Sequence, residues 1–296
     1  MLVITGSLLF CSKGILVKLM YAEGISPGGV LTLRMISALP FFVLMVALLG
    51  REVLTVRLKD WGLMALLSFV GYFLCSLVNF TGLQHISVGL ERVILFSYPT
   101  LVLAGSVLFQ GAKHSPKMYA ACALSWVGLY LLIRQEISFA GDYNLVILGS
   151  VMVLASAIIY AAYIIIAKPV IQRVGVQRYT GISMSFSCFF VLGYFTSTGG
   201  EFSSLFVSPK VIAYGVIIGV FGTVIPTFLL SYGLSKISSS SYAVVSSIGP
   251  VITIVLAAVF VGNQLAGLQL IGMGFSITGG VLASIQGRAA KIPKRA

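Results

Sequence analysis

The stretch "GLQHIS" at residues 82–87 recurs as "GLSKIS" at residues 233–238, a displacement of 151 residues. The same displacement superimposes further residues without a gap. The matched pairs are mostly helix-breaking or small residues: Pro99 with Pro250, Phe109 with Phe260, Gly111 with Gly262, Ser125 with Ser276 and Gly128 with Gly279. Apolar sequences share Leu and Val by chance, but matched prolines, glycines and a six-residue loop indicate an internal repeat.

The composition indicates that most of the chain lies in lipid. Of its 296 residues, 58% are hydrophobic and 9% are charged, and the mean hydropathy is +1.07. Soluble domains carry about 25% charged residues, so this chain lacks the residues for a polar surface. The net charge of +12 comes from basic residues scattered between apolar runs, without the basic patch of a nucleic-acid-binding protein. We therefore expect the lipid bilayer, and no nucleic acid, as a partner.

Ten apolar segments follow one another along the chain, joined by short, turn-like connections. Each segment is close to the about 20 residues that an α-helix needs to cross the hydrocarbon core. The expected spans are 2–20, 28–49, 61–82, 89–110, 117–134, 145–167, 178–197, 210–231, 239–262 and 266–286. The sequence therefore predicts an all-α polytopic membrane protein with ten transmembrane helices.

The distribution of Lys and Arg predicts the orientation of these helices. If the N-terminus is cytoplasmic, only Arg92, Arg134 and Lys210 fall on the outer side, and most of the other basic residues fall in inner loops or the C-terminal tail. Cytoplasmic loops are enriched in Lys and Arg, so this arrangement satisfies the positive-inside rule. We expect a multi-pass protein of the cytoplasmic (inner) membrane with both termini in the cytoplasm, which requires an even number of helices.

The repeat divides the ten helices into two groups of five. We expect a first repeat at 1–138, a second repeat at 144–287 and a basic cytoplasmic tail at 288–296. Because five is odd, the second repeat enters the membrane in the opposite orientation to the first. Inverted repeats of this kind are typical of secondary transporters, whose substrate site lies near the membrane midplane at the repeat interface.

The stretch "ERVILFSYPTLV" at residues 91–102 places Pro99 near the middle of the fourth span, and Pro250 has the matching place in the ninth. Proline removes a backbone donor and displaces the carbonyl four residues earlier. Such breaks are tolerated in lipid where neighbouring helices or water satisfy the freed groups. We predict a cavity between these two helices, with Pro99 and Pro250 as hinges. Kinks that serve packing alone are the alternative.

The chain resembles the drug/metabolite transporter superfamily, specifically a pair of EamA-type repeats. The resemblance rests on Lys18 near the end of the first span, the turn "ISPGG", and "LTLRMIS" with Arg34 in the second span. The "GL…IS" loop, the mid-helix proline and the glycine that ends the fourth helix of each repeat also match. The family often has Glu after that glycine, but Ala112 and Asn263 stand there in this chain, so no role of that glutamate carries over.

The resemblance implies a secondary transporter, an exporter or exchanger, of small organic metabolites such as amino acids or related compounds. A membrane scaffold or receptor without transport is the alternative. The sequence contains no P-loop motif for ATP, its four cysteines are isolated, and no cluster of acidic, His or nucleophilic residues suggests an enzyme. We expect no cofactor and no metal. A monomer and a homodimer are both compatible with the sequence.

Charged residues within the spans are the first candidates for the substrate site. Lys13 lies near the middle of the first span, where a cation costs about 2.5–3.5 kcal/mol on insertion scales, so we expect it to contact an anionic group of the substrate. Lys18, Arg34 and Glu91 lie near the outer ends of their spans. We predict that they form an outer gate in which Glu91 pairs with Arg34 or Lys18. Snorkelling cations and a weak surface pair are the alternatives.

Aromatic and amide side chains supply the rest of the predicted pocket. The set comprises Tyr72, Asn79, Phe96, Tyr98, Tyr160, Tyr163, Tyr232 and Tyr242. From this set we select Tyr98 and Tyr160 as substrate-binding residues, because both lie near the middle of a span. Packing and anchoring at the membrane interface are the more usual roles of tyrosine in membrane helices.

Overall fold

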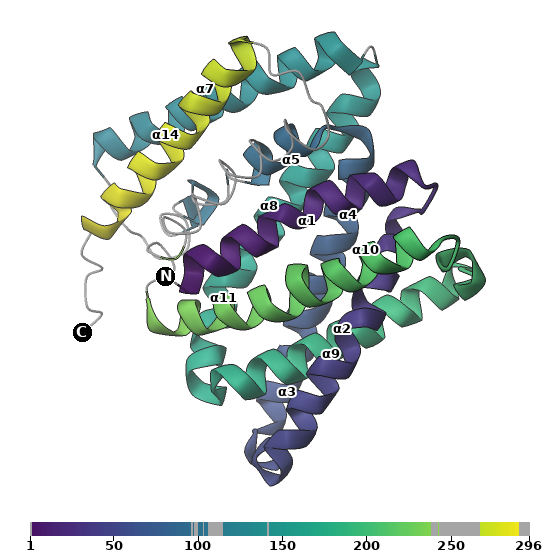
Figure 1. Cartoon of the computed structure of the whole chain (residues 1–296). Helices are drawn as coiled ribbons and strands as arrows, with labels where there is room; N and C mark the ends of the chain where they lie inside the picture. Colours follow the sequence, from purple (N-terminus) through teal and green to yellow (C-terminus); the bar gives the residue numbers. More distant parts are fainter. Residues whose placement is uncertain are drawn as a thin grey trace.

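The computed structural model describes residues 2–95, 97, 100–102, 104–105, 115–140, 142–237, 242 and 267–289, and every regular element among them is helical (Figure 1). The α-helices are α1 (Leu2–Ala22), α2 (Pro27–Leu49), α3 (Leu58–Leu67), α4 (Cys75–His85), α5 (Val88–Leu95), α7 (Pro116–Ala140), α8 (Tyr143–Val174), α9 (Val176–Ser197), α10 (Pro209–Gly219), α11 (Ile225–Lys236) and α14 (Gly267–Ala289). Two 3-10 helices, η1 (Gly50–Thr55) and η3 (Phe202–Leu205), lie in connections. Two π-helical segments, η2 (Ser68–Leu74) and η4 (Val220–Val224), interrupt longer helices.

Local sequence explains where several helices begin and end. Ser26 accepts a hydrogen bond from the backbone N–H of Gly29 (3.1 Å), and Pro27 follows as the first residue of α2. Asp142 caps α8 in the same manner, and Gly175, with a φ of 94°, separates α8 from α9. A side-chain acceptor satisfies free N–H groups of a first helical turn, and glycine adopts a positive φ without strain. Short connections therefore suffice between long helices.

Six helical segments of the described chain are long and apolar enough to cross a membrane. They are Leu2–Ala22, Pro27–Thr55, Leu58–His85, Pro116–Gln135, Tyr143–Val174 and Pro209–Lys236, which correspond to the first, second, third, fifth, sixth and eighth expected spans. The seventh and tenth expected spans are the helices α9 and α14, and α5 covers the start of the fourth. The ninth lies outside the described residues. An all-helical, multi-pass membrane protein is confirmed, whereas the total of ten helices stays a prediction.

Contacts between helices of the two halves occur in matching pairs, in which the first and the second half are swapped. α4 of the first half packs against α8 of the second, and α1 of the first half packs against α11 of the second. α2 packs against α9, and α7 packs against α14 (Figure 1). Under the 151-residue displacement, α1 corresponds to α8 and α4 corresponds to α11, so these two contacts are copies of each other. The halves are intertwined, and space between them is lined by both.

Both halves interrupt one helix with a π-helical segment at the matching place. η2 lies between α3 and α4, and η4 lies between α10 and α11. The 151-residue displacement superimposes Gly71 of η2 on Gly222 of η4. Tyr163 of α8 packs over Gly71, and Lys13 of α1 packs over Gly222. Because π-helical segments are rare and frequently lie at functional sites, a site is expected around this pair.

The buried apolar side chains form two main clusters that meet at η2. The first joins α1, α2, α4 and α9 and includes Phe42, Phe80 and Met184. The second joins α3, α8, α9 and α11 and includes Ile164. Tyr72 of η2 packs against both clusters, so this π-helical segment lies where the two clusters meet.

In the α7–α14 pair, a glycine of each helix contacts a serine of the other helix, and the two contacts match under the displacement. A Cβ atom at Gly128 would overlap the backbone of Ser276, and a Cβ atom at Gly279 would overlap the backbone of Ser125. Gly128 matches Gly279, and Ser125 matches Ser276, under the same displacement. Small residues let membrane helices approach closely, so these positions explain why the two helices pair.

Candidate functional site

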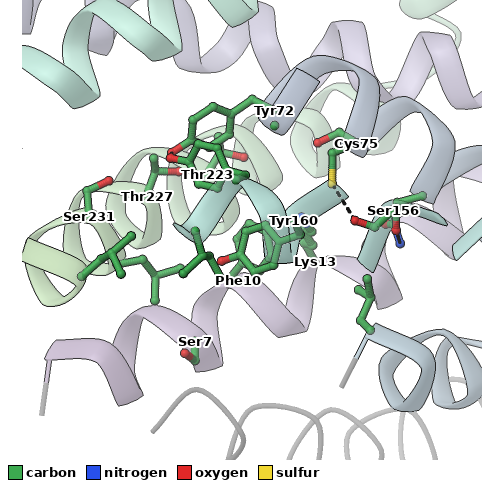
Figure 2. Close-up of a pocket in the computed structure, with 18 of the residues that line it drawn as sticks. Ser7, Phe10, Lys13, Tyr72, Cys75, Ser156, Tyr160, Thr223, Thr227 and Ser231 are labelled. Carbon is green, nitrogen blue, oxygen red and sulfur yellow. Dashed lines mark hydrogen bonds between the residues drawn. The ribbon is translucent and has the colours of Figure 1, made fainter. Parts of the chain in front are cut away.

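A cavity of about 120 Å³ lies where the two π-helical segments approach α1, α2 and α8 (Figure 2). Its polar lining consists of three cations and many hydroxyl or amide groups: Lys13, Arg34, Arg92, Ser7, Tyr72, Ser76, Asn79, Ser156, Tyr160, Tyr163, Thr223, Thr227, Ser231 and Tyr242. Figure 2 shows Thr223, Thr227 and Ser231 along one side of the cavity and Cys75 and Ser156 on the other. Both halves of the chain contribute to the lining.

Lys13 of α1, the expected contact for an anionic group, lies in this cavity. Its side chain is 4% exposed, and its Nζ lies 3.5 Å from the centroid of the Phe10 ring and 5.7 Å from that of Phe80. The faces of aromatic rings attract a desolvated cation. No ion pair joins Lys13 to a carboxylate within the described part of the chain. Its charge is therefore available to a ligand, and contact with substrate stays a prediction.

Arg34 of α2 also lines the cavity. α2 begins at Pro27, so Arg34 lies two turns inside the helix, and its side chain is 2% exposed. Its Nη2 donates a hydrogen bond to Oγ of Ser76 (3.2 Å), and its Cζ lies 5.2 Å from the ring centroid of Phe80. Nε of Arg34 has no hydrogen-bond acceptor among the described residues. Arg34 and Lys13 thus approach the same aromatic ring with unsatisfied charge.

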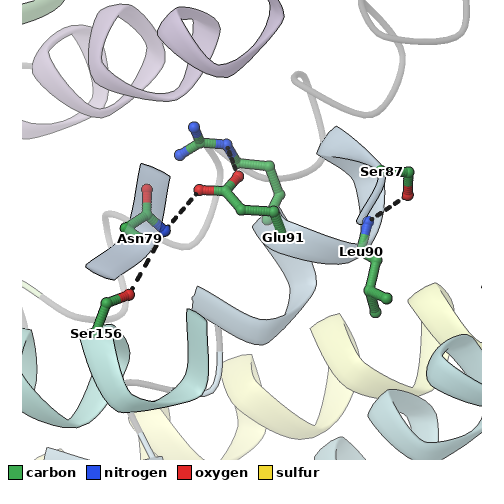
Figure 3. A network of polar contacts seen from close by, with 6 residues as sticks. Asn79, Ser87, Leu90, Glu91 and Ser156 are labelled. Atoms are coloured by element: carbon green, nitrogen blue, oxygen red, sulfur yellow. Dashed lines mark hydrogen bonds and ion pairs between the residues drawn. The ribbon is translucent and has the colours of Figure 1, made fainter. Parts of the chain in front are cut away.

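Glu91 of α5 belongs to a buried polar network beside the cavity (Figure 3). Nε of Arg92 lies 2.8 Å from Oε2 of Glu91, and neither side chain is exposed by more than 2%. Nδ2 of Asn79 donates a hydrogen bond to Oε1 of Glu91 (3.0 Å) and lies 3.5 Å from Oγ of Ser156. The network therefore ties α5 to α4 and α8 through one carboxylate.

The expected pairing of Glu91 with Arg34 or Lys18 is not what the structure shows. The carboxylate of Glu91 faces α4, where Asn79 binds it, and its counter-ion is the neighbouring residue of its own helix. Lys18 is half-buried away from the cavity lining, and its Nζ donates a hydrogen bond to the backbone carbonyl of Gln84 (3.4 Å). A role of Lys18, Arg34 and Glu91 in gating stays a prediction.

Arg92 is a cavity cation that was not expected, because the sequence placed it on the outer side. The backbone N–H of Leu90 donates to Oγ of Ser87 (3.2 Å) at the start of α5, and Arg92 is among the buried residues of this helix. Gly14 of α1 makes room for the guanidinium, since a Cβ atom there would lie 2.7 Å from Nη2 of Arg92. Nη2 has no hydrogen-bond acceptor within the described ranges. Gly14, next to Lys13, was the feature of the sequence that could have indicated a large side chain packed closely against α1.

Tyr160, one of the two tyrosines expected to bind substrate, lines the cavity. Its hydroxyl lies 3.1 Å from that of Tyr242, and its ring stacks on Tyr163 with a centroid distance of 6.0 Å. The hydroxyl of Tyr163 donates to that of Tyr72 (2.8 Å). Tyr72, Tyr163 and Tyr242 come from the wider aromatic set, whereas Tyr232 of that set is 38% exposed and lies outside the lining.

The predicted roles of Phe96, Tyr98, Pro99 and Pro250 fall on residues outside the described part of the chain. Leu95, the residue just before them in the fourth expected span, lines the cavity. Substrate binding by Tyr98 and bending at the two prolines stay predictions.

The hydroxyl groups of the second half were absent from the expected site. Thr223, Thr227 and Ser231 follow one another at intervals of four residues. Side chains at this spacing lie on one face of a helix, and in an apolar span such a polar face points away from lipid. The spacing of these three residues therefore indicates a polar helix face from the sequence alone, whereas the π-helical segment that contains Thr223 was not predictable.

Residues 1–134 and 147–285 match the model of the EamA-like transporter family. The chain belongs to this family. It is 29% identical over 283 residues to the uncharacterized transporter YcbK of Bacillus subtilis (strain 168), covering 93% of this chain and 89% of that protein. An uncharacterized transporter of Archaeoglobus fulgidus is 26% identical over 212 residues, 71% of this chain and 72% of that protein. A solved crystal structure shares the fold, with a TM-score of 0.70 at 16% identity over 97% of this chain and 96% of that chain.

Membership of the EamA-like family indicates a membrane transporter and not an enzyme. The described residues contain no group of three His, Cys, Asp or Glu side chains placed to hold a metal ion. What the cavity offers is charge from Lys13, Arg34 and Arg92 and a set of hydroxyl donors. Such groups are suited to binding an anion through charge-assisted hydrogen bonds.

Proposed function

We propose that this EamA-like protein is a secondary transporter that moves a small organic metabolite with an anionic group across the cytoplasmic membrane by alternating access. Amino acids and related carboxylates belong to this class of compound. The observation that carries the proposal is a buried cavity lined by Lys13, Arg34 and Arg92. Charged side chains within membrane-spanning helices are costly and lie chiefly on substrate pathways.

The size of the cavity supports a small substrate. Its volume of about 120 Å³ is well below the about 300–1,000 Å³ of sites for drug-sized ligands. Aromatic side chains such as Phe10 and Tyr160 surround the cations, so a bound anion exchanges water for fixed donors. A compact carboxylate fits this space better than an extended amphiphile.

The exchanged contacts of the two halves support alternating access. α1 and α8 occupy matching places, and each packs against the π-helical segment of the other half. We propose ten helices in two inverted repeats of five, with both termini in the cytoplasm. Rocking of one repeat against the other would then open the shared cavity to one side at a time, as in other inverted-repeat transporters. Export or exchange of a metabolite follows from such a cycle.

Counterflow in proteoliposomes tests the proposed function. Liposomes that contain the purified protein are loaded with an unlabelled panel of small carboxylates, including amino acids, and supplied with one labelled compound at a time. We expect at least one labelled carboxylate to accumulate transiently in these liposomes and not in protein-free liposomes. Binding in a thermal-shift assay without counterflow across the whole panel would overturn transport and favour a scaffold or receptor.

A further inference from the structure

The charges around the cavity do not balance. Lys13, Arg34 and Arg92 line it, and Glu91 is the acidic side chain beside it. Glu91 is already engaged by Arg92 at 2.8 Å and by Asn79 at 3.0 Å. Within the described residues, Lys13 and Arg34 therefore have no carboxylate partner, although both side chains are more than nine-tenths buried.

Among the acidic side chains that the structure describes, only Glu91 lies beside the cavity. The sequence has seven acidic residues, and the side chain of Glu136 is outside the described part. The other acidic residues with described side chains lie outside the cavity lining: Glu23, Glu52, Asp60, Asp142 and Glu201. Asp60 is paired with Arg173, and Glu52 lies 3.5 Å from Arg178. Among the described side chains, the cavity therefore has an excess of two positive charges.

Two buried cations without a counter-ion repel each other and are poorly solvated. Both line the same cavity and approach the ring of Phe80, Lys13 Nζ at 5.7 Å and Arg34 Cζ at 5.2 Å. A ligand with one negative charge would neutralise one of them. A zwitterionic amino acid would bring an ammonium group as a further cation, and Glu91, the acid nearest to it, is already paired.

We propose that the cavity selects a small organic dianion, such as a dicarboxylate or a phosphate monoester, over monoanions and zwitterionic amino acids. The two negative charges meet Lys13 and Arg34, with the free Nε of Arg34 as one donor. Thr227 and Ser231, which also line the cavity, offer hydroxyl groups to the remaining oxygen atoms (Figure 2). This inference rests on the proposed function and narrows its substrate class.

Matched probes of equal carbon skeleton test the charge rule. In the same proteoliposomes, succinate, monomethyl succinate and aspartate are compared, together with glutarate, monomethyl glutarate and glutamate. We expect uptake of the dicarboxylate to exceed that of its monoester and its amino acid by about tenfold or more, because a charge-assisted contact is worth about 1.5–3 kcal/mol. Glycerol phosphate serves as a further arm, and its preference over both dicarboxylates would identify a phosphate monoester as the dianion.

The possible outcomes separate this inference from the proposed function. Uptake of an amino acid or a monoester at or above that of its dicarboxylate, with no uptake of glycerol phosphate, overturns the dianion rule and leaves transport intact. Absence of flux for every probe and every member of the wider carboxylate panel overturns both. Uptake of a dianion with the expected preference supports both.

Variants of the two cations show whether charge or packing sets the preference. Lys13→Met and Arg34→Gln each remove one positive charge, and we expect the tenfold preference for succinate over monomethyl succinate to shrink towards equality. Lys13→Arg keeps the charge and should keep the preference. Lys210→Met, which removes an exposed charge, is the matched control. Equal losses for both compounds in the Lys13→Met variant, with an unchanged ratio, would contradict the charge rule and leave Lys13 a packing role.

Discussion

The first half of the chain supplies every charged side chain that lines the cavity, whereas the second half supplies most of its hydroxyl groups. The backbone does not share this asymmetry. Gly71 and Gly222 match under the 151-residue displacement, as do the π-helical segments that contain them. Glu91, in contrast, matches Tyr242. The glycines of the two π-helical segments are repeated, whereas the charged residues of the cavity are not.

This difference teaches how a repeated fold can bind an asymmetric molecule. Alternating access needs two halves that exchange roles, which depends on packing and helix breaks. A substrate with a charged end and a less polar end needs a cavity whose two sides differ in polarity. Lys13 packs over Gly222, and Tyr163 packs over Gly71, so a cation covers one of the two matching glycines and a phenol covers the other. Three of the predictions below compare residues at matching positions of the two halves.

The largest expected effect concerns Glu91 and its matching residue Tyr242. Glu91→Gln leaves Arg92 buried without a counter-charge, and breaking a buried ion pair costs about 3–5 kcal/mol of unfolding free energy. Tyr242→Phe removes a hydroxyl that lies 3.1 Å from that of Tyr160, a loss of about 0.5–1.5 kcal/mol. Thermal unfolding of the purified proteins in detergent measures both. Similar unfolding midpoints for the two variants would show that the Glu91–Arg92 ion pair stabilises the protein no more than the Tyr242 hydroxyl does.

The second effect concerns transport. Lys13→Met keeps the length of the side chain and removes the charge, so we expect transport to fall about tenfold or more, because charge-assisted hydrogen bonds contribute about 1.5–3 kcal/mol. Membrane insertion should be unchanged or improved, since the cost of a buried cation is removed. Lys18→Met should lose less, because Lys18 does not line the cavity. Transport at the parent rate by Lys13→Met would reduce Lys13 to a snorkelling residue.

A smaller effect separates the two π-helical segments. Gly71→Ala places a methyl group against the ring of Tyr163, which is buried, and overpacking of this kind costs about 1–3 kcal/mol. Gly222→Ala places it 3.3 Å from Cβ of Lys13, a contact that a slight shift relieves. We therefore expect a lower unfolding midpoint for Gly71→Ala than for Gly222→Ala. The reverse order would mean that the second π-helical segment is the tighter one.

The fold was predictable because it depends on features that recur. The apolar runs, the spacing of turns and the repeat at "GLQHIS" indicate a helical membrane protein of two halves, and the family match confirms the two repeats. The π-helical segments were not predictable, since η2 and η4 share with ordinary helices the same apolar composition. Only their glycines hinted at a close approach.

The sequence singled out Lys13, which lines the cavity, but it did not indicate that Arg92 lines it too or which residue pairs with Glu91. Lys13 stands out because a charge within an apolar run is costly. The depth of Arg34 depends on where α2 begins, and the sequence alone leaves that boundary uncertain by a few residues. The partner of Glu91 depends on which face of α5 is buried against α4, and this is set by tertiary packing. The sequence therefore did not predict how deep a single residue lies in its helix or which face of a helix is buried.

The smallest expected effect concerns Pro99 and Pro250, which match under the displacement and lie in the fourth and ninth expected spans. If both helices bend at these residues as access alternates, Pro99→Ala and Pro250→Ala restore a backbone donor and straighten one helix each. Because the halves are expected to be inverted, the two substitutions should favour opposite access states. We expect shifts of a few-fold in population, since a change of about 1 kcal/mol is enough for that.

Cysteine labelling in a cysteine-free background measures these populations. One reporter cysteine is placed at the outer end of the fourth helix and another at the inner end of the ninth. Under the hinge hypothesis, one proline variant gains labelling at the outer position and the other gains labelling at the inner position. Prolines that serve packing alone give a different result, because both variants then lose stability while the ratio of outer to inner labelling stays at the parent value. That result would leave charge asymmetry in the cavity as the functional difference between the halves and would remove the prolines from the transport cycle.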